Sequence, residues 1–315
     1  MIVTLTANPS LDRTVTLSDA LRVGEVQSAL SVREDAGGKG INVTRVLAGS
    51  GVATRAVLPL DADDPFAAVL RSAHVPVLAV PLPGTARANL TLTDSDGVTT
   101  KINLPGVTRT AQDAATLIDA TVRASADADW LVLAGSLPPG LSEDFYVDVI
   151  TAVRAAGASA PRIAVDTSGP ALREVVERGR PDLIKPNDEE LVELAGVALD
   201  AELPLPEAVL AVARQLVPTR VGAAFVTLGG DGAVLVAPDG AWFGTPPPTR
   251  VRSTVGAGDS SLAGFLLADV AGAAPDERVR SGIRYGSAAA ALPGTQAPTP
   301  TDLLPGDVPV RPLAL

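Results

Sequence analysis

The sequence contains no cysteine and only one histidine, His74, among its 315 residues. Without cysteine, the chain has no disulfide framework, no thiolate nucleophile and no cysteine-ligated zinc or iron–sulfur site. A single histidine also excludes a metal site built from several histidines and leaves little basis for a Ser-His-Asp triad. Chemistry that depends on thiolates or on several histidines is therefore disfavoured.

The sequence is also poor in positive charge and in long apolar runs. Lys and Arg number 25 against 36 Asp and Glu, so a net charge of −11 disfavours binding to nucleic acid or to an anionic membrane. The most apolar segment, 262–274, contains Asp269 and two glycines and is shorter than the roughly 18 residues of a membrane span. The first residues, MIVTLTANPSLDRT, lack the pattern of a signal peptide. We therefore expect a soluble cytoplasmic protein with no nucleic-acid partner and no membrane partner.

Short β-branched runs alternate with longer alanine-rich stretches of helical period, which predicts an α/β fold with a mostly parallel sheet. The expected strands are 2–6, 54–58, 75–80, 131–134, 163–166, 183–185, 223–227 and 233–236. The expected helices are 41–48, 65–73, 111–124, 143–156, 170–178, 189–195, 207–216, 259–270 and 276–290. The proline-rich end, 293–312, is expected to be irregular. Open α/β sheets bind ligands at the carboxyl ends of their strands, so the site should be sought there.

Two regions look like paired strands without intervening helices: 14–17 with 29–33, and 87–93 with 99–104. The turn Asp94-Ser95-Asp96-Gly97 favours a hairpin in the second region. We expect these strands to form a small antiparallel β lid over the carboxyl edge of the main sheet, inserted at about 12–35 and 86–104. Since the lid strands would have exposed edges, pairing across two subunits would protect them, and we expect a homodimer through the lid.

The strongest single feature is the segment STVGAGDS at 253–260, which leads directly into the apolar helical stretch 262–267. Glycines at a helix start allow backbone N–H groups to converge on a phosphate, which the positive end of the helix dipole also stabilises. Asp259 would lie beside that phosphate, where a carboxylate can deprotonate a hydroxyl nucleophile. The alternative is that Asp259 only caps the helix.

Two further segments lie at strand ends. The glycine turn TLGGDG at 227–232 is, taken alone, an ordinary hairpin. The segment LIKPNDEE at 183–190 ends a strand with Lys185, which would point at phosphate oxygens, and then opens a helix. Asn187 and Glu190 fall on one face of that helix start, where they would hold Mg²⁺ through its waters. The alternative is a capping box between Asn187 and Glu190.

The segment AGGKGINVTR at 36–45 is a glycine-rich loop that opens another helix. It is not a P-loop, because the GxxxxGK[ST] spacing is absent from the chain. Close backbone approach, Lys39 and the amide of Asn42 would suit a polyhydroxylated, phosphorylated small molecule. The alternative is a flexible turn with an exposed lysine. Asp12 would accept hydrogen bonds from sugar hydroxyls, unless it is only a turn residue.

These segments give the chain a resemblance, over essentially its whole length, to the ribokinase-like (PfkB) sugar kinases. It is most similar to the branch of that family that contains 1-phosphofructokinase and tagatose-6-phosphate kinase. The matching segments are TANPSLD at 6–12, GGKGINV at 37–43, GSLPPG at 135–140, KPN at 185–187 with Glu190, and STVGAGD at 253–259. The resemblance implies one kinase domain over 1–315, a three-layer α/β/α fold, ATP and Mg²⁺ as cofactors, and a sugar phosphate as acceptor.

The resemblance also implies roles for individual residues. Asp259 becomes the catalytic base, Asn187 and Glu190 would organise Mg²⁺, and the implied anion hole consists of Gly256, Ala257 and Gly258. The implied ATP-binding residues are Lys185, Asn187, Thr227, Leu228, Gly229, Gly230, Asp231, Gly232 and Gly258. The implied acceptor-binding residues are Asp12, Gly37, Gly38, Lys39, Asn42, Arg87 and Ser136. Of these, Lys39 and Arg87 would meet a phosphate already present on the sugar.

A kinase for an uncharged sugar needs no cationic pair in its acceptor site, so Lys39 and Arg87 favour a sugar phosphate. The expected reaction is ATP-dependent phosphorylation of fructose 1-phosphate at its 6-hydroxyl. Tagatose 6-phosphate or fructose 6-phosphate, with transfer to the 1-hydroxyl, stays open because the same loops would serve either acceptor. A dinucleotide-dependent oxidoreductase is disfavoured because no GxGxxG turn follows the first strand. Asp259 argues against a sugar-phosphate-binding regulator that has lost catalysis.

Overall fold

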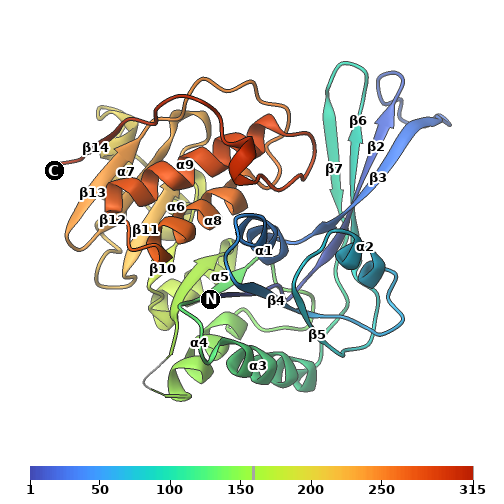
Figure 1. Cartoon of the computed structure of the whole chain (residues 1–315), viewed down its shortest axis with the longest axis horizontal. Coiled ribbons are helices and arrows are strands. Elements are labelled where there is room, and N and C mark those ends of the chain that lie inside the picture. Colours follow the sequence, from blue (N-terminus) through green and yellow to red (C-terminus); the bar gives the residue numbers. More distant parts are fainter. Residues whose placement is uncertain (158–159, 315) are drawn as a thin grey trace.

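The computed structural model describes residues 1–157 and 160–314, and a ten-stranded sheet forms its centre. The strands lie in the order β14-β13-β12-β11-β10-β9-β8-β1-β4-β5 (Figure 1). Neighbours from β11 to β5 pair in parallel, whereas β12, β13 and β14 pair antiparallel at one edge. The bounds are β1 Ile2–Leu5, β4 Thr54–Pro59, β5 Val77–Val80, β8 Trp130–Ala134, β9 Arg162–Asp166, β10 Leu183–Ile184, β11 Ala223–Thr227, β12 Ala233–Ala237, β13 Gly240–Gly244 and β14 Val310–Pro312.

Helices cover both faces of this sheet, and the central strands are apolar on both sides for that reason. β1 and β8 are buried along their whole length. One apolar core cluster lies between the sheet and α1, α8 and α9, a second lies between the sheet and α3, α4 and α7, and a smaller third one packs α2 on β4. Figure 1 shows these helices around the sheet. The helices are α1 Lys39–Gly49, α2 Phe66–Ser72, α3 Ala111–Ser125, α4 Phe145–Ala155, α5 Gly169–Glu174, α6 Asp188–Ala195, α7 Leu205–Ala213, α8 Ala257–Val270 and α9 Pro275–Ala291. The predicted three-layer α/β/α fold with a mostly parallel sheet is confirmed.

The order of the strands determines where a ligand site can open. After β1, the next strands of the main sheet in the sequence, β4 and β5, are added on one side of β1. β8 is added on the other side, and β9, β10 and β11 follow it in that direction. The direction of filling therefore reverses between β1 and β8, and such a switch point leaves a crevice at the carboxyl ends of the strands. Asn8 follows β1, Ser136 follows β8, and Asn8 Nδ2 lies 3.4 Å from Ser136 Oγ across the crevice.

A second, smaller sheet projects beyond the main one (Figure 1). Its strands lie in the order β3-β2-β6-β7, with bounds β2 Ser10–Leu17, β3 Ala29–Gly37, β6 Arg87–Thr93 and β7 Thr99–Asn103. Both predicted strand pairs form and are antiparallel, and a parallel pairing of β2 with β6, which the sequence did not predict, joins them. β3 is longer than predicted and ends at Gly37, so the small sheet runs directly into the glycine-rich loop before α1.

The C-terminal region differs from the irregular chain expected there. Residues 310–312 form β14, which pairs with β13, and Val308 is fully buried. Proline is tolerated in such an edge strand because its missing N–H leaves no internal ladder bond unmade. The predicted helix 170–178 also differs, since α5 ends at Glu174 and a π-helix continues over Val175–Gly179. Within the described residues, no helix has both the length and the apolar character required to cross a membrane.

Candidate active site

The first turn of α8 is left open, because no side chain caps it. Gly256 is the N-cap residue with φ of 78°, a left-handed conformation that glycine adopts without strain. Lys185 lies close to this turn, since a Cβ on Gly258 would be 3.2 Å from Lys185 Nζ. N–H groups of the first turn, the positive end of the helix dipole and an ammonium group therefore meet at one place, which suits an anion.

Asp259 lies in this first turn but does not cap it. Its Oδ2 accepts a hydrogen bond from Asn42 Nδ2 at 2.8 Å, and the residue is only 7% exposed. Burial and the charge of Asp166 raise the pKa of Asp259 to about 6, against the opposing effect of Lys39. A carboxylate with this proton affinity is ionised at neutral pH and is a stronger base than an ordinary aspartate, as proton abstraction requires. Helix capping therefore does not account for Asp259.

Asp166 is a buried carboxylate for which no role was predicted. It ends β9 and is 1% exposed, with Oδ1 accepting from Lys39 Nζ at 2.7 Å and Oδ2 lying 3.2 Å from Lys185 Nζ. Burial alone would raise the pKa of Asp166, but Lys185 and Lys39 outweigh burial and lower it. One carboxylate therefore holds two lysines from distant parts of the chain beside Asp259. The signal in the sequence was the aspartate at the carboxyl end of a predicted strand.

Lys39 is consequently fixed in place and is not a flexible surface lysine. It opens α1 directly after the N-cap residue Gly38. Burial works against its charge, but Asp166 and Asp259 outweigh burial and raise the pKa of Lys39. Asn42, one turn further along α1, donates to Asp259, while its own Oδ1 is buried without a hydrogen-bond partner. The glycine-rich loop therefore delivers a permanent cation and an open amide oxygen to the same crevice.

Asp12 lies on β2, where the small sheet meets the main one. Its Oδ1 accepts from Ser10 Oγ at 2.8 Å and from Asn89 Nδ2 at 2.9 Å. A Cβ on Gly37 would lie 2.3 Å from the Asp12 carboxylate, so only glycine allows the loop to approach this closely. Asn89 Oδ1 is buried without a partner, a second open amide oxygen that sequence reasoning missed. These carboxylate and amide oxygens suit a ligand with several hydroxyl groups.

Arg87 begins β6 and lies at the far end of the same crevice. It shares with Asn8 the lining of a pocket that holds about 240 Å³ of empty space, including the part open to solvent. Its Nη1 donates to the carbonyl oxygen of Leu104 at 3.2 Å. Asn8 also reaches Ser136, so the pocket borders the loop that follows β8. Lys39, predicted to meet the same phosphate as Arg87, is instead paired with Asp166.

Of the predicted nucleotide-side residues, Lys185 and Gly258 lie in the anion site at the start of α8, and the glycine turn forms a separate flank. The turn 227–232 joins β11 to β12 through a short 3₁₀-helix, Gly229–Asp231, and Leu228 N donates to Gly232 O at 2.8 Å. Thr227 and Asn187 form an isolated parallel β-bridge, which connects the turn to the loop that carries Lys185. A Cβ on Gly229 or Gly230 would meet no atom within 4 Å, so the turn presents an open surface. Among the described residues, no hydrogen bond or ion pair links this turn to Asp259.

Asn187 and Glu190 form the capping box that the sequence left as an alternative. Glu190 N donates to Asn187 Oδ1 at 2.6 Å, and Asn187 N donates to Glu190 Oε2 at 3.0 Å. Over residues 1–157 and 160–314, no three or more acidic or histidine side chains gather as a metal cage. Mg²⁺ often keeps several waters and takes one or two carboxylates together with substrate phosphates. Since the box uses Oε2 of Glu190, Oε1 fits a contact with Mg²⁺ through water.

Comparison with known proteins agrees with this geometry. The sequence matches the pfkB family carbohydrate kinases over residues 6–302. A 1-phosphofructokinase of Rhodobacter capsulatus is 36% identical over 310 residues, covering 96% of this chain and 94% of that protein. ATP-dependent 6-phosphofructokinase isozyme 2 of Escherichia coli is 32% identical over 299 residues, covering 94% of each chain.

Among solved structures, phosphofructokinase-2 from Escherichia coli in complex with substrates and products is similar, with a TM-score of 0.87 and 31% identity. That similarity covers 96% of each chain. Together with the family match over nearly the whole sequence, it shows that the chain belongs to the pfkB family of carbohydrate kinases and is a phosphotransferase.

Proposed function

We propose that the protein transfers the γ-phosphoryl group of ATP to the 6-hydroxyl of fructose 1-phosphate, giving ADP and fructose 1,6-bisphosphate. The observation that carries this proposal is Asp259, a buried carboxylate of raised pKa at the open start of α8. Membership of the carbohydrate kinases supports ATP as the phosphoryl donor. The name of the Rhodobacter capsulatus relative supports fructose 1-phosphate as the acceptor.

In the proposed mechanism, Asp259 accepts the proton of the attacking hydroxyl as the new oxygen–phosphorus bond forms. Negative charge on the transferring phosphoryl group is stabilised by N–H groups of Gly256, Ala257 and Gly258 and by the ammonium of Lys185. Because Asp166 already holds Lys185 in place, this positive charge needs little reorganisation during the reaction. Bound Mg²⁺, held through water by Asn187 and Glu190, would neutralise charge on the phosphates of ATP.

The acceptor would lie between the small sheet and α1. Asp12, Asn89 and Asn42 offer oxygens to its hydroxyls, while Gly37 and Gly38 allow close backbone approach. The proposed positions of the remaining groups follow the predicted roles: Lys39, Arg87 and Ser136 toward the acceptor, and Thr227, Leu228, Gly229, Gly230, Asp231 and Gly232 toward the nucleotide.

The acceptor is tested by measuring kcat/KM with ATP and Mg²⁺ for fructose 1-phosphate, fructose 6-phosphate and tagatose 6-phosphate. Asp259→Asn, purified in parallel, controls for contaminating kinases. We expect fructose 1-phosphate to give the highest kcat/KM. A preference for fructose 6-phosphate would instead place this chain's activity with that named for the Escherichia coli isozyme, and an absence of turnover with all three acceptors would refute a ketohexose-phosphate kinase.

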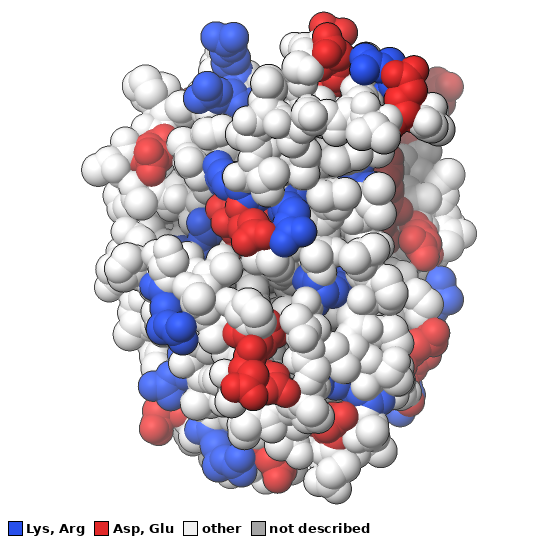
Figure 2. Space-filling model, turned by 90° about the vertical axis from the view of Figure 1, so that its right-hand side faces the viewer, with Lys and Arg blue, Asp and Glu red and all other residues white. Residues whose placement is uncertain are grey.

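We also propose that the small sheet is a lid within one kinase domain and joins two copies of the chain into a dimer. Its residues Val32 and Ile102 are 57% and 46% exposed. Val32 pairs with Val15, which in turn pairs with Leu92, so an apolar row crosses three strands. On the side of the molecule where this sheet lies, charged side chains of both signs are scattered between uncharged areas (Figure 2). A second copy would cover the apolar row and the edge strand β3.

The dimer is tested by sedimentation of the wild-type chain, of Val32→Asp and of the control Val197→Asp, whose side chain is exposed after α6. We expect the wild type and the Val197 variant to sediment as dimers and Val32→Asp as a monomer. A monomeric wild type at micromolar concentration would refute the dimer.

A further inference from the structure

The pocket at the far end of the crevice contains two arginines and no carboxylate. Arg87 and Arg109 both line it, together with Asn8 and with apolar or proline residues. Within the described residues, neither guanidinium has an acidic group within 4.0 Å. Two positive side chains that line one pocket favour an anionic ligand. The lining therefore carries positive charge alone in a chain whose net charge is −11, and Asp12 and Asp113 act on the two arginines only from outside the pocket.

Arg109 is the more buried of the two, with only 7% of its surface exposed. Its Nη1 donates to the carbonyl oxygen of Pro83 at 2.8 Å, but its buried Nε has no hydrogen-bond partner. Burying an arginine without an acceptor for each N–H is costly, so such a group indicates an acceptor that binds from outside the chain. The backbone of Arg109 is fixed as well, since its N–H donates to Pro139 O at 2.8 Å.

Arg87 repeats this pattern in the same pocket. Its Nη1 donates to Leu104 O, and its buried Nε again has no partner. Two guanidinium groups, each anchored by one carbonyl oxygen and each with an unused N–H, are preorganised for an anion with several oxygens. A phosphate monoester, with its dianionic charge and three free oxygens, matches two such forks better than a carboxylate does.

The pocket is continuous with the candidate active site through Asn8 and Ser136. A sugar whose hydroxyl reaches Asp259 would therefore extend its opposite end toward the two arginines. We propose that Arg109 is a specificity-determining residue that, together with Arg87, binds the phosphate that the acceptor sugar already carries. This inference rests on the proposed function. It identifies Arg109 as a residue by which the enzyme would discriminate a sugar phosphate from a free sugar.

Because the bound phosphate does not react, its contacts contribute equally to the ground state and to the transition state. Loss of Arg109 should therefore raise KM for the sugar phosphate and leave kcat nearly unchanged. A charge-assisted hydrogen bond at a buried site corresponds to a change of roughly 10- to 100-fold in affinity.

The test compares Arg109→Gln with Arg154→Gln, a control in α4 whose guanidinium also donates to carbonyl oxygens, those of Gly179 and Arg180. Binding of fructose 1-phosphate without ATP is measured by titration calorimetry, alongside KM, kcat and the melting temperature. We expect Arg109→Gln to weaken binding and raise KM about 10- to 100-fold with kcat within about threefold, and Arg154→Gln to change neither. Unchanged binding of fructose 1-phosphate by folded Arg109→Gln would overturn the inference.

If the glutamine variant does not fold, Arg109→Lys serves as the test, because it keeps the positive charge. It removes the planar fork and should weaken binding of fructose 1-phosphate by about tenfold. Wild-type affinity in this variant would show that the fork is not used, and would overturn the role of Arg109.

A separate measurement distinguishes failure of this inference from failure of the proposed function. Inorganic phosphate is titrated into the wild type and into Arg109→Gln, since it probes the pocket without any sugar. If no ketohexose phosphate is turned over but phosphate still binds the wild type and not the variant, the proposed function fails and the anion pocket stands. If fructose 1-phosphate is turned over with the same KM in both proteins, the function stands and the inference fails.

Discussion

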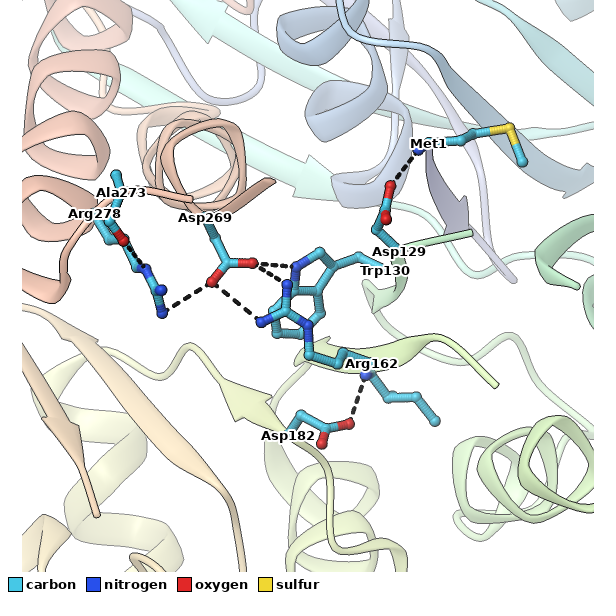
Figure 3. A network of polar contacts seen from close by, with 9 residues as sticks. Met1, Asp129, Trp130, Arg162, Asp182, Asp269, Ala273 and Arg278 are labelled. Carbon is cyan, nitrogen blue, oxygen red and sulfur yellow. Dashed lines mark hydrogen bonds and ion pairs between the residues drawn. The ribbon is translucent and has the colours of Figure 1, made fainter. Parts of the chain in front are cut away.

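Two aspartates ten positions apart on α8 are both buried, yet their surroundings are opposite in kind. Asp259 in the first turn is 7% exposed and Asp269 in the last turn is 6% exposed. Asp259 receives one side-chain hydrogen bond, from Asn42, and its pKa is raised to about 6. Asp269 receives charged and neutral donors from three residues and forms the centre of a polar network (Figure 3).

The network around Asp269 lies at the amino ends of β8 and β9, away from the crevice. Trp130 Nε1 donates to Asp269 Oδ2 at 2.8 Å, and Arg162 donates to both of its carboxylate oxygens. Arg278 Nη1 lies 2.9 Å from Oδ1, and Arg162 also stacks on the indole of Trp130, with 4.3 Å between its Cζ and the ring centroid. A carboxylate near a helix C-terminus opposes the dipole, and these two arginines offset that penalty.

This difference separates a structural carboxylate from a chemical one. A buried charge whose oxygens are all occupied ties elements together and is unavailable to a ligand. A buried charge with a single donor destabilises the fold but keeps an oxygen free to take a proton. Active sites concentrate such incompletely compensated groups, and they decrease stability there.

The largest expected effect that follows from this contrast is on turnover. Asp259→Asn should lower kcat by about 10²- to 10⁴-fold, because an amide cannot accept the proton of the attacking hydroxyl. Initial rates with ATP, Mg²⁺ and fructose 1-phosphate measure the change. Asp269→Asn is the matched control on the same helix and should keep kcat within about twofold at a temperature where it is folded. Equal losses of kcat in both variants would remove the distinction between the two aspartates.

The second largest expected effect is a loss of stability when Asp269 is replaced. Asp269→Ala leaves Arg162, Arg278 and the Trp130 N–H without their acceptor, and we expect it to lower the free energy of unfolding by about 3 kcal/mol. The value is at the low end for a buried pair because the side chains of Arg162 and Arg278 are 48% and 30% exposed. Denaturant unfolding measures the change, and a loss below about 0.5 kcal/mol would show that the network contributes little.

The contrast also explains which parts of the site were visible in the sequence. Asp259 was found because its signal is local: glycines stand immediately before it and an apolar helix follows. Asp166 was missed because its meaning depends on Lys39, 127 positions away, and on Lys185 from a different strand end. Arg109 was missed for the same reason, since its partner in the pocket, Arg87, is brought near only by the fold.

The same limit applies to the fold. Parallel strands and their helices were predicted because each has its own hydrophobic period, and their alternation indicates an α/β fold with a mostly parallel sheet. The three-layer arrangement was implied by the family resemblance. β13 and β14 were missed because three to five residues interrupted by glycine and proline carry no period. The parallel pairing of β2 with β6 was not predictable either, since nothing near either hairpin specifies the other.

The third expected effect is also on stability, but in the opposite direction: replacing Asp259 should increase the free energy of unfolding. The pKa of Asp259 is about 6 in the folded protein against an ordinary 3.8, so the folded state holds the proton more tightly between these values. Above pH 6 the ionised carboxylate therefore opposes folding, and the penalty disappears as the pH falls below about 4. At pH 7.5, Asp259→Asn should be more stable than the wild type, by on the order of 2 kcal/mol.

Denaturant unfolding at pH 7.5 and at pH 4 measures this gain. The difference between Asp259→Asn and the wild type should shrink at the lower pH, where the carboxyl of Asp259 is protonated in the folded protein. A variant that is less stable than the wild type at pH 7.5 would contradict the incomplete compensation of Asp259.

The smallest effect concerns the pH dependence of the rate. With a base of pKa about 6, kcat/KM should fall about tenfold per pH unit below pH 6 and level off above pH 7. Lys39 lowers the pKa of Asp259, so Lys39→Met should move this acid limb to higher pH even though its overall rate is also reduced. Asp269→Asn should leave the limb in place, because its network lies at the opposite end of α8. An acid limb that moves with Asp269 and not with Lys39 would mean that the whole helix, and not the charges in the crevice, determines the basicity of Asp259.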